Sequence, residues 1–121
     1  TIMSGPSRNA YKQNSRANRG DSKGMVVLPR EGVDLPIPDP PATTKFGKAQ
    51  RERYDSLWRS PQSSQWDDSV AGQVALLVVL EDQLLAGNGT AWTASTVQNI
   101  SDSLGLTPKA MAHLGWVMSS E

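Results

Sequence analysis

The sequence predicts an all-α protein, a small bundle of about four helices preceded by an extended, proline-rich, basic N-terminal arm. Three observations support this class. Apolar residues recur at helical spacing after residue 43, glycine and proline separate the periodic segments, and the preceding residues are mostly polar or proline. We therefore expect a flexible basic arm over residues 1–25, an extended proline-rich strap over 26–42, and a helical oligomerisation domain over 43–118.

The chain is neutral overall, but its positive charge is concentrated near the N-terminus. Residues 1–30 hold six cations against Asp21 alone, a net charge of +5, and the remaining residues carry −5. The six cations are Arg8, Lys12, Arg16, Arg19, Lys23 and Arg30. With few large apolar residues, the arm cannot offset the entropy lost on ordering. Spaced cations on such an arm favour contact with nucleic-acid phosphates, and a merely solubilising tail is the alternative.

The strap is dominated by proline. Val26–Leu28 can pair as a short edge strand, and five prolines between positions 29 and 41 favour extended, polyproline-type backbone. Two interpretations remain open for its apolar residues Val33, Leu35 and Ile37. They lie across the helical body, or the strap is a ligand for a proline-binding groove.

A first helix is expected from Thr43 or Thr44 to about Arg59, because aromatic and apolar residues recur there at spacings of three and four. Its other face is charged. Arg51 and Asp55 lie four apart with opposite charge, so we interpret that face as solvated. A Ser-Pro pair then ends the helix.

The longest predicted helix spans residues 64–86 and organises the chain. Ser64 can cap its start, two aspartates fall in its first turn, and Gly87 stands just beyond its end. From Val74 to Leu80 the helix is apolar nearly all round, so it should be covered on several sides. A domain of about eighty residues buries too little surface for this, and we therefore expect self-association.

Two tryptophans flank the turn between these helices. Trp58 and Trp66 are expected to be core anchors, with stacking on nucleic-acid bases as the alternative. The residues expected in the core or at an interface between copies are Trp58, Trp66, Val74, Leu77, Val78 and Leu84.

Two further helices are expected near the C-terminus. Thr90 caps the first, which runs to Leu104 and stops at Gly105. Thr107 caps the second, with Pro108 at its first position.

This helix pair also fits a helix-turn-helix pattern. Its second helix would present Thr107, Lys109 and His113 to a major groove, a set poor in the side chains that read base edges. From residue 60 onward Lys109 is the only cation. A purely structural helical hairpin is the alternative to a DNA reader.

The sequence contains no convincing active site. Without cysteine and with one histidine, it has no disulfide and no zinc site of the usual ligands. Gly47-Lys48 lacks the remaining residues of a phosphate-binding loop, and the longest apolar run is far below the roughly 20 residues that span a bilayer. We expect a non-catalytic, soluble intracellular protein with no metal, no cofactor and no membrane segment.

Three segments together resemble the small subunit of phage terminases. They are the basic arm followed by residues 27–32, the run 57–68 with two tryptophans around a Ser-Pro-Gln turn, and the ending 104–111. The resemblance covers residues 26–116. It implies an all-helical protein that assembles into a ring and binds the packaging-initiation region of viral double-stranded DNA. It also implies a large-subunit partner carrying ATPase and nuclease activities, and action in the host bacterial cytoplasm.

Two other functions remain open. A transcriptional regulator would use residues 96–116 as its reader and form a dimer on a palindromic site. A virion structural or scaffold protein would line packaged DNA with its arm and show no sequence preference.

Overall fold

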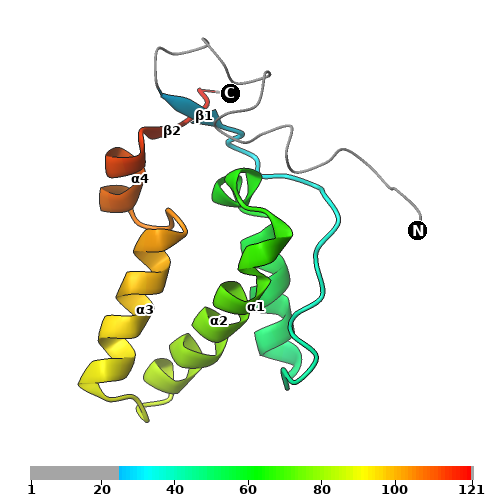
Figure 1. Ribbon diagram of the computed structural model, residues 1–121, viewed down its shortest axis with the longest axis vertical. Helices are drawn as coiled ribbons and strands as arrows, with labels where there is room; N and C mark the ends of the chain where they lie inside the picture. Colours follow the sequence, from blue (N-terminus) through cyan, green and yellow to red (C-terminus); the bar gives the residue numbers. More distant parts are fainter. Residues whose placement is uncertain (1–24, 121) are drawn as a thin grey trace.

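The computed structural model describes residues 25–120 and is mostly helical (Figure 1). Its elements, with η for a 3-10 helix, are β1 (Val26–Leu28), α1 (Lys48–Trp58), η3 (Pro61–Gln65), η4 (Asp68–Val70), α2 (Ala71–Leu85), α3 (Ala91–Ser103), the shorter α4 (Pro108–Leu114) and β2 (Trp116–Met118). The prediction of a mostly helical chain is confirmed. The all-α class was incomplete, because β1 and β2 form a short parallel sheet.

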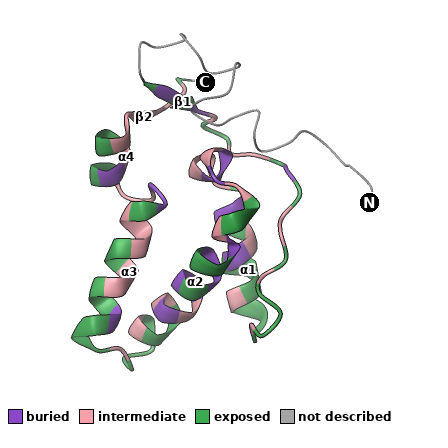
Figure 2. Cartoon of the chain, in the orientation of Figure 1, coloured by how far each residue is buried: buried purple, intermediate pink, exposed green. Residues whose placement is uncertain are grey.

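The central helix α2 packs against both α1 and α3 (Figure 1). Val74, Leu77 and Val78 are fully buried within the single chain. The expectation that a second copy must cover this helix is therefore wrong for most of its surface. Helices α1 and α3 lie on two sides of α2, and Figure 2 shows buried residues along it. Among the large apolar side chains of α2, only Leu76 and Leu85 are exposed.

The helix begins at Ala71 and not at Ser64, as the apolar pattern had suggested. Two 3-10 turns precede it. The buried hydroxyl of Ser63 donates to the carbonyl of Trp58 at 2.9 Å, and the side chain of Asp67 caps η4. Such side-chain bonds to the backbone compete with a continuous helix.

The first helix also begins later than the sequence predicts. Gly47 is its N-cap, and Gln50 Oε1 accepts from the Gly47 amide at 2.9 Å. The expected cap, Thr43 or Thr44, instead falls in a turn closed by the Thr44 amide and the Pro41 carbonyl.

The other predicted helix ends are confirmed. The hydroxyl of Thr90 accepts from Thr93 N at 3.2 Å, and that of Thr107 accepts from Ala110 N at 3.1 Å. Gly87 has a φ of +83°, as a left-handed helix stop requires.

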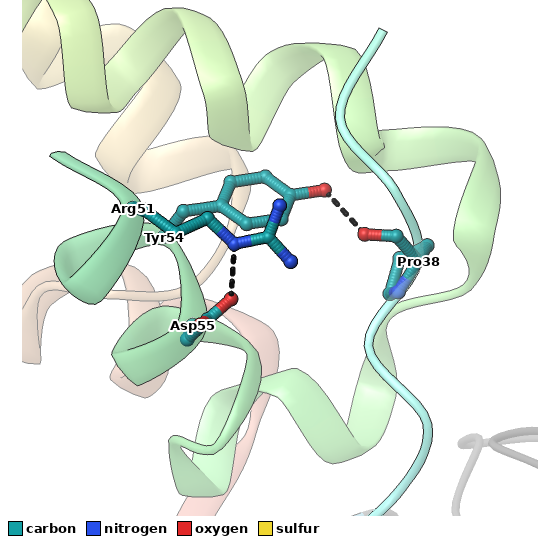
Figure 3. Close-up of polar contacts among 4 residues, drawn as sticks. All are labelled: Pro38, Arg51, Tyr54 and Asp55. Carbon is teal, nitrogen blue, oxygen red and sulfur yellow. Dashed lines mark hydrogen bonds and ion pairs between the residues drawn. The ribbon is translucent and has the colours of Figure 1, made fainter. Parts of the chain in front are cut away.

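The strap lies across the helical body, which confirms the first of its two interpretations. Leu35 is buried, and Ile37 packs against the core. Tyr54 donates its phenol proton to the Pro38 carbonyl at 2.9 Å (Figure 3). Burial raises the pKa of Tyr54 above its ordinary value of 10.0, although the nearby Arg51 charge opposes the shift.

The expected edge strand β1 finds its partner at the other end of the body. It pairs in parallel with β2, from Val26 opposite Trp116 to Leu28 opposite Met118. The Ser119 amide extends the ladder by donating to the Leu28 carbonyl at 2.9 Å. The whole helical body is therefore the connection between two parallel strands.

The two central tryptophans are core anchors, as expected. Trp58 is 0% exposed and Trp66 is 4% exposed, and their rings meet edge to face with centroids 5.1 Å apart. The indole N–H of Trp66 donates to the Leu104 carbonyl at 2.9 Å. The alternative of stacking on nucleic-acid bases is wrong, because neither ring reaches the surface.

Candidate nucleic-acid interface

Most of the predicted arm cations lie outside the part of the chain that the structure describes. Those outside the described residues are Arg8, Lys12, Arg16, Arg19 and Lys23. Arg30 is described and lies in the strap, two residues after β1. Its amide donates to Ser119 Oγ at 3.0 Å, and its Nε donates to the Ser119 carbonyl at 2.6 Å. Arg30 therefore ties the start of the strap to the residue just after β2.

The predicted helix-turn-helix pair is built rigidly onto the core. Gly105 turns the chain with a φ of +73°, and a Cβ added there would lie 2.0 Å from the Trp116 ring. Only glycine fits at this place. The hydrogen bond from Trp66 to the preceding Leu104 carbonyl fixes the turn from the other side.

The candidate reader residues come together on α4. The Thr107 hydroxyl is already engaged, because it accepts the cap bond from Ala110 N and donates to Asp102 Oδ1 at 2.7 Å. Lys109 and His113 are exposed. Both line a surface hollow of about 520 Å³ with Asp102, Ser103, Ala110 and Leu114. One lysine beside one carboxylate makes this a weak site for phosphate.

A stronger cationic surface lies on α1 and just beyond both of its ends. Five cations and two carboxylates between positions 45 and 59 give a net charge of +3, and all five cations are exposed. The cations are Lys45, Lys48, Arg51, Arg53 and Arg59. The sequence interpretation of this face as solvated missed this cationic surface. The net charge of residues 45–59, and not the single Arg51–Asp55 pair, is the signal in the sequence that indicates it.

Two of these five cations are paired. Arg51 Nε lies 3.1 Å from Asp55 Oδ1, which confirms the expected pair, and the Arg51 guanidinium lies over the Tyr54 ring (Figure 3). Arg53 binds both carboxylate oxygens of Glu81, at 3.1 and 3.2 Å, and so joins α1 to α2.

The other three cations make no ion pair within residues 25–120. They are Lys45, Lys48 and Arg59. We call these three side chains the α1 surface. Their charge remains available to an anionic partner.

The predicted core or interface residues are mostly interior to one chain. Trp58, Trp66, Val74, Leu77 and Val78 are buried, and Leu84 is half-buried against Gly89. A role for them between copies stays a prediction. The large apolar side chains of the helical body that do reach the surface are Leu76, Leu85 and Trp92, exposed by 47%, 87% and 67%.

No three metal-ligating side chains gather between residues 25 and 120. Over the same residues, no helix has the length and apolar character that crossing a bilayer requires.

Comparison with known proteins identifies the family. No curated protein and no solved structure matches the chain. A family model described as phage terminase small subunit matches residues 3–116, nearly the whole of the 121-residue sequence, and confirms the resemblance. The chain therefore belongs to the phage terminase small subunit family and has a role in phage DNA packaging.

Proposed function

We propose that the chain is the non-catalytic, DNA-recognising subunit of a packaging terminase. It binds phage genomic DNA at the packaging-initiation site, assembles into a ring, and recruits or regulates the large ATPase and nuclease subunit in the host cytoplasm. The observation that carries this proposal is the family match over residues 3–116. The separation of charge along the chain supports a specific way of holding the DNA.

The arm supplies the first contact with DNA. Five cations between positions 8 and 23 precede a body that is acidic overall. An acidic body repels the duplex as a whole, so spaced cations on the arm would neutralise phosphates and release counterions. Binding through the arm would be salt-dependent and largely independent of sequence.

Assembly would use the exposed apolar residues of the body. A ring needs two different surfaces on each subunit, one for each neighbour. Leu85 and Trp92 flank the α2–α3 turn, whereas Leu76 lies nine residues before Leu85 on α2. These separate positions support a head-to-tail contact better than a two-fold one.

The test compares wild type with a variant in which the five arm cations between positions 8 and 23 are changed to glutamine. Each lost phosphate contact should make the slope of log affinity against log salt shallower by about 0.9. Light scattering of the same samples should give a closed oligomer for both proteins. A monomer indifferent to duplex DNA at low salt contradicts the proposal, and a dimer on a palindromic site favours a transcriptional regulator.

A further inference from the structure

We propose that the α1 surface is where the helical body contacts DNA phosphates, and that the α3–α4 hairpin is not. This assignment rests on the proposed DNA-binding function and adds Lys45, Lys48 and Arg59 to the arm as binding residues.

The distribution of charge is the first argument. Five of the seven cations in residues 25–120 lie between positions 45 and 59. The rest of the described body has two cations, Arg30 and Lys109, against eight carboxylates. A duplex approaching the body therefore meets attraction at α1 and repulsion over most of the remaining surface.

The geometry of the helix is the second argument. Lys48 and Arg59 are eleven positions apart, about three helical turns, so their side chains lie on one face. The rise along the axis between them is about 16 Å. Since the major groove is about 12 Å wide, the two ends of α1 can reach phosphates on both of its sides.

The position of the strap, which follows the arm in the chain, is the third argument. The Arg59 carbonyl accepts from the Val33 amide at 3.1 Å, so one end of the α1 surface lies beside the strap, three residues from Arg30. Figure 1 shows α1 and α4 separated across the fold, with α2 between α1 and α3. One duplex can therefore contact the arm and α1 together without contacting α4.

Glu52 supplies a test in the opposite direction. It lies four residues after Lys48 on the same face of α1 and is exposed. Its carboxylate repels phosphate within the α1 surface. Removing this charge should tighten DNA binding, which is a gain that damage to the fold would not mimic.

The experiment measures binding of full-length variants to one random duplex at about 50 and about 200 mM salt. K48Q is matched with K109Q, since both remove one exposed lysine charge. We expect the advantage of wild type over K48Q to shrink about 3.5-fold between the two salt concentrations, and K109Q to behave as wild type. The triple variant K45Q/K48Q/R59Q should make the salt slope shallower by about 2.7. E52Q should bind more tightly than wild type, whereas D68N, which removes an exposed carboxylate on η4, should not.

The outcomes separate the two proposals. Wild-type protein that shows no salt-dependent binding overturns the proposed function itself. Wild-type binding that K109Q weakens and K48Q leaves unchanged overturns the α1 assignment and places the contact on the hairpin. Binding that only the arm variant weakens also overturns the assignment, because the arm would then act alone.

Discussion

Replacing Gly32 with alanine tests how the strap is held against α1. Gly32 has a φ of +86°, and a Cβ added there would lie 2.1 Å from the Arg59 carbonyl oxygen. The obstacle is backbone, so the strap itself must move. That movement breaks the hydrogen bond from the Val33 amide to the same carbonyl and pulls on buried Leu35.

The expected loss can be worked out against a matched glycine. Gly87 has a nearly equal φ of +83° with nothing within 4 Å of an added Cβ. Gly87→Ala should therefore cost only the left-handed backbone strain, about 1 kcal/mol. Gly32→Ala adds about 1 kcal/mol for the hydrogen bond and up to about 2 kcal/mol for displaced Leu35, so we expect a loss of about 2 to 4 kcal/mol.

Thermal unfolding followed by circular dichroism measures both variants. A loss of 1 kcal/mol corresponds to about 4–8 °C in a domain of this size, so Gly32→Ala should lower Tm by at least about twice as much as Gly87→Ala. Protein concentration must be equal in all samples, because self-association would raise Tm with concentration. Equal losses in the two variants would refute the contact between the strap and Arg59.

Four further substitutions test the strap, the core and the cap of α4. Tyr54→Phe should lose about 1 kcal/mol with the bond to Pro38. Because burial raises the pKa of Tyr54, the unfolded chain releases the phenol proton at a lower pH than the folded chain does. The stability of the wild type should therefore fall as the pH rises above 10.0, and the stability of Tyr54→Phe should fall less steeply. Thermal melts at alkaline pH check this difference. Leu77→Asp should abolish the cooperative unfolding transition, whereas Leu76→Asp at the exposed neighbouring position should stay folded by circular dichroism. Thr107→Ala should lose about 1 kcal/mol in urea unfolding with the cap of α4 and leave DNA affinity unchanged; a fall in affinity would return the hairpin to consideration as a reader.

Local signals predicted the helix ends that depend on local bonds. Thr90 and Thr107 each accept a hydrogen bond from an amide three residues later, so a short stretch of sequence contains the whole interaction. The predicted start of α2 was wrong because the side chains of Ser63 and Asp67 form hydrogen bonds with the backbone just before the helix. Nothing in the apolar periodicity distinguishes those two possibilities.

Contacts between distant residues were beyond the sequence pattern. Val26 and Trp116 are ninety positions apart, and neither short strand carries a signal that names its partner. The shielding of α2 was missed for the same reason, because it depends on where α1 and α3 lie.

The candidate site was half visible from the sequence. Counting charge finds the arm, but the Arg51–Asp55 pair led to the interpretation that the charged face of the first helix is only solvated. The structure shows that Asp55 and Glu81 engage one arginine each, which leaves Lys45, Lys48 and Arg59 without an ion pair in the described part of the chain.

The parallel pairing of β1 with β2 determines how the body would respond to mechanical tension. A pull on the chain before Val26 against the chain after Met118 slides the two strands past each other along their length. Under this pull all hydrogen bonds between the two strands bear the force together, in shear. The helices bear none of it until the strands separate. Tension on the chain before Val26 would thus be resisted first by the β1–β2 pair.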